Sequence, residues 1–298
     1  MSVAEAEAKQ IAVEGQAGLW SDAFDRLKRN PGAVAGAVIV LLFVALAVFA
    51  PAIAPHDPNE QVGALASNPE GPSAAHWMGL DEQGRDFFSR VIYGSRLSLL
   101  TGLVSVAIGL LFGVVLGALA GYLGGWVDTV IMRFMDIMLS IPGLLLAIAI
   151  VTATDRGLFP IMFAIGIINV PIFARLLRGS ILAQREADYV LAARSLGATG
   201  PRLLAVHILP NAIAPVIVQA TLAMATAIIE VAALSFLGLG PSDPGFPEWG
   251  KMVADNSNRL TESTHLIFFP GFAIVLSVLG INLIGDGLRE AIDPKLRS

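Results

Sequence analysis

The sequence predicts an all-α membrane protein with six transmembrane helices. Of its 298 residues, 55% are hydrophobic and 14% are charged, whereas a soluble domain carries about 25% charged residues. The apolar residues gather in long runs, and about 20 apolar residues in a helix cross a hydrocarbon core of about 30 Å. Each run is expected to be a helix, because backbone groups in lipid must bond within their own segment and the alternation typical of strands is absent.

Six long apolar runs account for the predicted spans. The first run has 22 residues, whereas the core of a cleaved signal peptide has about 7–15. We therefore expect a retained membrane anchor at this position. The predicted spans are residues 32–53, 97–121, 130–152, 158–177, 212–239 and 266–284.

Lysine and arginine set the predicted orientation, because they are enriched in cytoplasmic loops. With both termini in the cytoplasm, 13 of the 19 lysine and arginine residues fall on the cytoplasmic side. The largest cytoplasmic loop then lies between the fourth and fifth spans. The predicted parts are a cytoplasmic tail (1–31), a first helix with an extracytoplasmic segment (32–96), a five-helix core (97–288) with its loop at 179–211, and a second cytoplasmic tail (289–298).

That loop contains the stretch EADYVLAARSLGATGPRLLAVHILP at 186–210, which predicts a helix at 186–198. Acidic residues suit its first turn, apolar residues recur at helical spacing, and Gly197 suits its end. A helix lying on a membrane carries bulky apolar residues and basic flanks, whereas this one offers mainly Ala, Leu and Gly. A groove on another protein is the favoured partner, and a membrane surface is the alternative. The predicted contact residues are Glu186, Asp188, Tyr189, Ala192, Ala193, Leu196, Gly197 and Ala198.

Polar residues inside the predicted spans are the candidate pore-lining groups. Glu230 lies in the fifth span, and an ionisable group at that depth usually faces a cavity or a partner. We expect it either to line the pore and meet an ammonium group or a cation, or to bond a neighbouring helix. Asn169 and Asn282 are further pore candidates, with hydrogen bonding between helices as the alternative role.

Other residues in the spans predict packing and bending. Arg133 and Asp136 are three residues apart, which predicts an ion pair on one helix face. Pro142 and Pro171 are expected to kink or break their helices. Glycines recurring every four residues predict close packing of the second span against a neighbour. These glycines are Gly109, Gly113, Gly117 and Gly121.

Several stretches resemble one family of membrane proteins. AARSLG at 192–197 followed by LP at 209–210 resembles the signature loop of ABC importer permeases, with Leu191 and His207 standing where the family has Glu and Ile. HWMGLDEQGRDFFSRVIYGSRLSL, MRFMDIMLSIPGLLLA, EVAALSFLGLG and GDGLREAIDPKLR resemble the dipeptide, oligopeptide and nickel branch. The long outer segment after a single first span is similar to the C-type subunit of that branch. The positions that match the signature are Ala192, Ala193, Gly197, Leu209 and Pro210.

The resemblance implies a type I ABC importer permease in the bacterial inner membrane, with a cytoplasmic coupling helix between spans four and five. It implies a pore shared with a homologous B-type subunit, two ABC ATPases that each hold one coupling helix, and an extracytoplasmic substrate-binding protein. ATP and Mg are expected on the ATPases, because this chain has no G-x-x-x-x-G-K-[ST] phosphate loop. No catalytic residue, cofactor, metal site or nucleic-acid partner is expected for this chain.

The long outer segments, 54–96 and 240–264, are the expected docking region for the binding protein. Trp77, Arg85 and Asp86 are the docking candidates, since aromatic residues are enriched at protein interfaces. Alternatively, Trp77 and Trp249 are anchors at the membrane–water interface.

Di- or oligopeptides are the expected cargo, and nickel or another small solute is the alternative. An ion-coupled secondary transporter or channel is an alternative of a different class. It is disfavoured because the spans carry one isolated Glu and show no repeated halves. An intramembrane enzyme is disfavoured because H-E-x-x-H and G-x-S-x-G motifs are absent.

Overall fold

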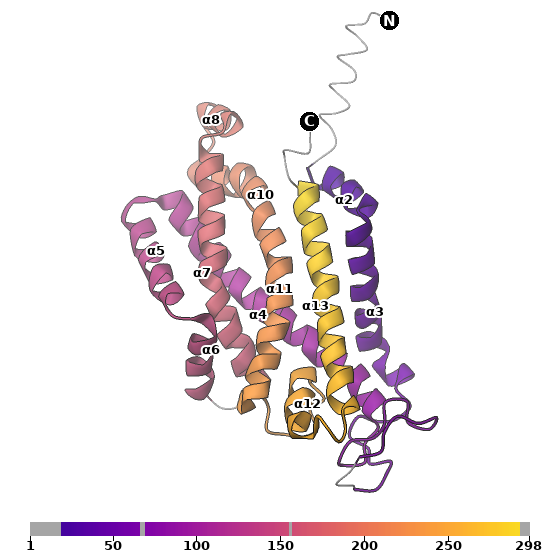
Figure 1. Cartoon of the computed structure of the whole chain (residues 1–298). Helices are drawn as coiled ribbons and strands as arrows, with labels where there is room; N and C mark the ends of the chain where they lie inside the picture. The colour runs from indigo at the N-terminus through magenta and orange to yellow at the C-terminus, as the bar shows by residue number, and fades with distance from the viewer. Residues whose placement is uncertain (1–18, 66–68, 155–156, 293–298) are drawn as a thin grey trace, which may run out of the picture.

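The structure, a computed structural model, is a bundle of helices (Figure 1). It describes residues 19–65, 69–154 and 157–292, so residues 1–18 of the predicted tail 1–31 and residues 293–298 of the predicted tail 289–298 lie outside the described residues. The helices are α2 (Leu19–Arg29), α3 (Pro31–Ile53), α4 (Phe87–Leu123), α5 (Gly125–Ser140), α6 (Gly143–Thr152), α7 (Leu158–Arg185), α8 (Asp188–Ser195), α9 (Gly200–Arg202), α10 (Leu209–Ala212), α11 (Ala214–Leu234), α12 (Trp249–Asn256) and α13 (His265–Ile292), with π-helical turns at Leu203–Ile208 and Ser235–Leu239 and a 3-10 turn at Ser257–Arg259.

Five of these elements are long and apolar enough to cross a membrane. They are α3, α4, α7, α11 with the π-helical turn that follows it, and α13. The helices α5 and α6 form a sixth candidate span only as a pair, which bends by 91° at its break. In Figure 1 this pair begins near the end of the bundle that carries α8 and finishes near the end that carries α12. The third predicted span therefore corresponds to a bent pair of helices rather than to one continuous helix.

Proline chemistry explains the break between α5 and α6. The residue before a proline is driven out of the helical region, and Ile141 has ψ 129°. Pro142 itself has ψ 126° and precedes the first residue of α6. The predicted break at Pro142 is confirmed, whereas α7 continues through Pro171 as one helix.

The predicted glycine stripe on α4 faces α7, as close packing requires. A methyl group at Gly117 would lie 2.5 Å from the Ala174 carbonyl oxygen, and one at Gly113 would lie 2.5 Å from the Phe173 Cβ. The absence of a side chain at these positions lets the two backbones approach each other. Figure 1 shows α4 crossing the bundle obliquely behind α7, α11 and α13.

Ion pairs tie α5 to α7. Asp128 pairs with Arg178, and Asp136 accepts a 2.8 Å hydrogen bond from Arg175. The predicted pair between Arg133 and Asp136 is therefore wrong. The carboxylate of Asp136 bonds across to the neighbouring helix because α5 packs along α7 and presents this face to it.

An arginine compensates for a proline in α3. Pro51 has no N–H, so the carbonyl of Ala47 loses its helical donor. The Arg96 Nε on α4 donates to that carbonyl at 2.6 Å, and its guanidinium also reaches the Val48 carbonyl at 3.3 Å. This contact fixes the outer end of α3 against α4.

We expect Gly117→Ala to lower the melting temperature of the purified protein in detergent micelles. The added methyl group would collide with the α7 backbone at Ala174, and overpacking typically costs about 1–3 kcal/mol. Gly179→Ala on α7 is the matched control, because a methyl group there meets no atom within 4 Å. Equal melting temperatures for the two variants would contradict the close α4–α7 contact.

Candidate coupling helix, pore cavity and outer surface

The predicted loop helix is present as α8. It follows α7 almost directly and projects from the end of the bundle where α2 and the last turns of α13 also lie (Figure 1). Gly197 has φ +83°, a left-handed conformation that favours glycine. The Ala198 N–H then donates to the Ala193 carbonyl at 3.1 Å. These features end the helix where the sequence predicts its end.

The two faces of α8 have different environments. Val190 is fully buried, and Ala193, three residues on, is partly buried against the main hydrophobic core. Tyr189 and Leu191 are exposed by 41% and 43%, and Leu196 is exposed by 89%. The predicted apolar stripe therefore does not form one outer face, because Ala193 shares the inner face with Val190. Among the predicted contact residues, the exposed ones are Glu186, Asp188, Tyr189, Ala192, Leu196 and Gly197.

Polar contacts of Tyr189 attach α8 to two other helices. The Tyr189 hydroxyl donates to Gln184 of α7 at 2.5 Å and accepts from Asn211 of α10 at 3.2 Å. Arg185, the last residue of α7, donates to the carbonyls of Gly121 and Tyr122 at the end of α4, at 3.2 and 3.3 Å. The base of α8 is therefore connected to α10 directly and to α4 through the end of α7.

A cavity of about 260 Å³ lies at the break between α5 and α6. Glu230 of α11 and Asn169 of α7 both line it, together with Ile141 and Pro142 at the break. Among the described residues, Glu230 Oε2 is inaccessible to solvent and has no hydrogen-bond partner. Asn282 lies on α13 and does not line this cavity. The structure thus brings together two of the three pore candidates.

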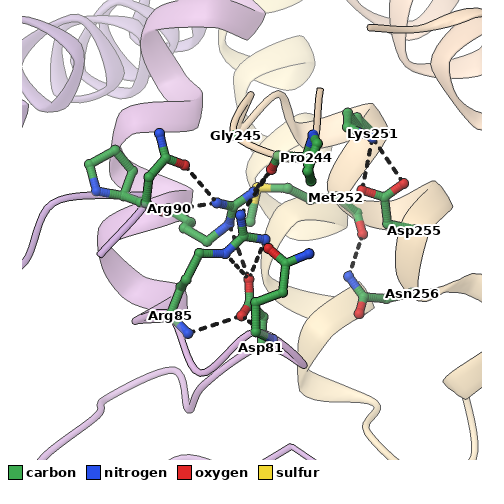
Figure 2. Close-up of polar contacts among 12 residues, drawn as sticks. Asp81, Arg85, Arg90, Pro244, Gly245, Lys251, Met252, Asp255 and Asn256 are labelled. Atoms are coloured by element: carbon green, nitrogen blue, oxygen red, sulfur yellow. Dashed lines mark hydrogen bonds and ion pairs between the residues drawn. The ribbon is translucent and has the colours of Figure 1, made fainter. Parts of the chain in front are cut away.

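Buried charges connect segments at the end of the bundle that carries α12 (Figure 2). The Arg85 guanidinium donates to Asp81 at 2.7 Å and to the Pro244 carbonyl at 3.0 Å. Arg90 donates to the same Pro244 carbonyl at 3.1 Å and to the Pro58 carbonyl at 2.8 Å. Asp81, Arg85 and Arg90 are each buried, and a buried charge is tolerated only when it is paired and hydrogen-bonded. The sequence analysis did not predict this cluster, because its members come from three distant segments.

The three predicted docking residues have different surroundings. Arg85 is committed to the internal cluster, and Asp86 is 1% exposed and caps α4 by accepting from the Ser89 N–H at 2.8 Å. Trp77 is 68% exposed, and its ring meets Phe88 edge to face at 5.0 Å. Of the three, only Trp77 offers an exposed side chain to a partner.

Trp249 belongs to the core, so its predicted alternative as an interfacial anchor is wrong. It is fully buried, and its indole N–H donates to the Val91 carbonyl at 2.9 Å. Its ring also packs edge to face on Phe43 at 5.4 Å. Burial among α3, α4 and α12 excludes it from the lipid interface.

Glu248, which the sequence analysis missed, caps α12 from inside the protein. Its carboxylate accepts from the backbone N–H groups of Gly250 and Lys251, both at 2.8 Å. Burial raises the pKa of this carboxyl above its ordinary value of 4.5, although the hydrogen bonds from Gly250, Lys251 and Ser98 oppose the rise. An acidic residue directly before the helical WGKMVADN stretch was the available sequence signal.

Five helices long and apolar enough to cross a membrane, with α5 and α6 as a possible sixth span, define a multi-pass membrane protein. Residues 113–298 match the family described as binding-protein-dependent transport system inner membrane component. Residues 18–72 match the N-terminal transmembrane domain of oligopeptide transport permease C. The chain belongs to the binding-protein-dependent transport system inner membrane component family, and it is a multi-pass protein of the bacterial inner membrane.

Relatives of this chain share most of its length. The dipeptide transport system permease protein DppC of Alkalihalophilus pseudofirmus is 48% identical to this chain. The matched region covers 94% of this chain and 91% of the relative. The glutathione transport system permease protein GsiD of Pectobacterium atrosepticum is 43% identical, over 94% of this chain and 92% of the relative. A MetNI methionine ABC transporter structure matches with a TM-score of 0.56 and 19% identity, over 68% of this chain and 96% of that one. The last similarity concerns the fold, and the predicted family is confirmed.

We expect the stability contributed by Glu248 to fall with rising pH. Its raised pKa means that folding favours the protonated carboxyl, so its stabilisation is fully present below pH 4.5 and is lost as the pH passes the raised pKa. The melting temperature of the wild-type protein should therefore fall relative to that of Glu248→Gln between about pH 4 and about pH 8.

Glu262→Gln is the matched control for this series, because it alters an exposed carboxylate of the same outer segment. It should show no such trend relative to wild type. A constant difference between wild type and Glu248→Gln across the series would mean that burial does not perturb Glu248.

Proposed function

We propose that this chain is one of two pore subunits of an ATP-driven, binding-protein-dependent importer of di- or oligopeptides. The names of its relatives, which share 43–48% of their residues with it, support a peptide as cargo. Family membership decides against the ion-coupled transporter or channel. The second pore subunit is a homologous B-type permease, and the substrate-binding protein docks on the outer segments near Trp77.

The proposed topology has six spans with both termini in the cytoplasm. It counts α5 and α6 as one broken span, in keeping with their joint course from one end of the bundle to the other. The end that carries α2 and α8 is then cytoplasmic, and the end that carries α12 and the 54–86 segment is extracytoplasmic. The excess of lysine and arginine on the cytoplasmic side supports this orientation.

The observation that carries the proposal is the form of α8. It presents an exposed apolar surface, including Leu196 at 89%, on a helix whose opposite face is anchored by the buried Val190. We propose that this surface lies in a groove of a partner ATPase, with the loop 179–211 as the coupling element. ATP and Mg bind to the two ATPase subunits, and this chain has no nucleotide site of its own. Closure of the ATPase pair moves α8, and Arg185 and Tyr189 pass the movement to the ends of α4 and α10.

The cavity at the α5–α6 break is the proposed contact with the cargo. The unpartnered Oε2 of Glu230 provides a negative charge at the depth of the spans, and the ammonium group of a peptide supplies the matching donor. Asn169 of α7 also lines this cavity. An ionisable group inside a membrane protein is costly unless it serves such a cavity.

We expect Leu196→Glu to reduce ATP-dependent peptide uptake by about tenfold or more, because a charge would enter an apolar groove. The measurement is uptake of a dipeptide into proteoliposomes that contain the complete transporter, with ATP hydrolysis followed in parallel. Insertion should be normal, since Leu196 contributes little buried surface.

Leu65→Glu is the matched control, because Leu65 is 71% exposed and lies in the outer segment away from α8. It should leave binding of the ATPase subunits at the wild-type level. Uptake and ATPase binding at wild-type levels in Leu196→Glu would refute the coupling role of α8.

We expect Glu230→Gln to slow uptake of a dipeptide with a free amino group by about tenfold, the scale set by losing one charge-assisted hydrogen bond. Uptake of the N-acetylated dipeptide should change much less. Asn282→Ala, which alters a span residue outside the cavity, should affect neither cargo.

The same assay with Ni²⁺ separates the cargo classes. A wild-type transporter that takes up Ni²⁺ and neither peptide would overturn the peptide assignment. Equal slowing of both peptides by Glu230→Gln would instead assign the carboxylate a structural role.

A further inference from the structure

Two histidines and an aspartate converge at the outer end of the bundle. His56 follows the end of α3, His76 lies in the segment between α3 and α4, and Asp86 precedes the first residue of α4. One ligand atom from each of the three residues lies within 4.8 Å of those of the other two. The four histidines are scattered along the sequence, which is why the sequence analysis predicted no metal site.

The two carboxylate oxygens of Asp86 have different partners, Ser89 and His76. Its Oδ2 accepts from the Ser89 N–H at 2.8 Å and from the Ser89 hydroxyl at 2.7 Å. Its Oδ1 lies 3.1 Å from the His76 Nδ1. Capping of α4 therefore occupies one oxygen and holds the other toward the imidazole. The Asp86 side chain is 1% exposed, so this negative charge lies in a site largely closed to water.

His56, the other histidine of the cluster, lies near the carboxylate of Glu60. The His56 Nδ1 lies 3.9 Å from Glu60 Oε2, an ion-pair distance longer than a hydrogen bond. A carboxylate in this position is suited to accept the second ring N–H of a histidine that turns to bind a metal. The side chains of His56 and His76 are 31% and 15% exposed, so an ion can enter from solvent.

We propose that His56, His76 and Asp86 form a binding site for a divalent transition metal of the zinc class. Imidazole nitrogen with carboxylate oxygen is a ligand set that suits Zn²⁺. Bond lengths of about 2.0–2.2 Å place tetrahedral ligand atoms about 3.3 Å apart, close to the 3.1 Å between His76 and Asp86. A side-chain rotation of His56 brings in the third ligand, and water takes the fourth position.

The bound ion joins three segments that are otherwise held by separate contacts. It links the end of α3 and the start of α4 to the outer segment, directly beside the exposed Trp77. The metal therefore fixes the shape of the outer surface around Trp77. The proposal does not depend on the peptide cargo or on the coupling role of α8.

The test is Zn²⁺ binding to the full chain in lipid nanodiscs, purified through a tag without histidine and stripped with a chelator. We expect one Zn²⁺ per chain in competition with a chromophoric chelator, and a rise in melting temperature when Zn²⁺ is added. His56→Gln should weaken binding by at least about tenfold and abolish the rise, and Glu60→Gln should weaken it by about tenfold.

His207→Gln is the matched control, because His207 lies in the coupling loop at the other end of the bundle. It should bind Zn²⁺ as the wild type does. His56→Gln retains every hydrogen bond that caps α4, so loss of folding does not confound the result. Absence of stoichiometric Zn²⁺ binding by the wild type, or equal affinity in wild type and His56→Gln, would overturn the proposal.

Discussion

The close approach of α4 to α7 is the constraint on which the arrangement of the other helices depends. Glycines on α4 leave no room for a side chain against the α7 backbone, where a methyl group at Gly117 would lie 2.5 Å from the Ala174 carbonyl. This contact brings the end of α4 beside the end of α7, where Arg185 bonds it. The helix α5 packs against both α4 and α7, and Arg175 and Arg178 hold it to α7 through ion pairs. The row of glycines on α4 therefore sets the positions of the two helices against which α5 packs.

Most of the fold could be predicted from the sequence, because bilayer thickness fixes the length of an apolar helix. The run at 32–53 corresponds to α3 within one residue. The boundaries of α4 and α7 could not be predicted so well, since both helices extend beyond the hydrocarbon as polar, ion-paired turns such as the one that bears Arg90. Hydropathy detects lipid burial, whereas these turns are stabilised by contacts with distant segments.

The candidate sites were predictable to different degrees. The loop helix has a local signal, because its acidic start, helical spacing and terminal Gly197 all lie within a dozen residues. The meeting of Glu230 with Asn169 depends on the packing of α11 against α7, which no local pattern encodes. Arg85 and Asp86 were predicted to face a partner because they are charged residues of a long outer segment. Arg85 is instead buried against Asp81, and Asp86 is buried as an acceptor for the Ser89 N–H. These pairings form only when the segment folds.

The helix α7 connects the two functional elements of the proposal. Asn169 lines the cavity and Arg185 is the last residue of α7 before α8, and a separation of 16 positions corresponds to about 24 Å of helix. Pro171 lies two residues beyond Asn169 and removes one backbone hydrogen bond from α7 at the level of the cavity. In the proposed mechanism, force applied at α8 would be carried along the intact part of α7 and would bend the helix where this bond is missing. The cavity wall at Asn169 would then move relative to the break at Pro142, because both line the cavity that holds Glu230.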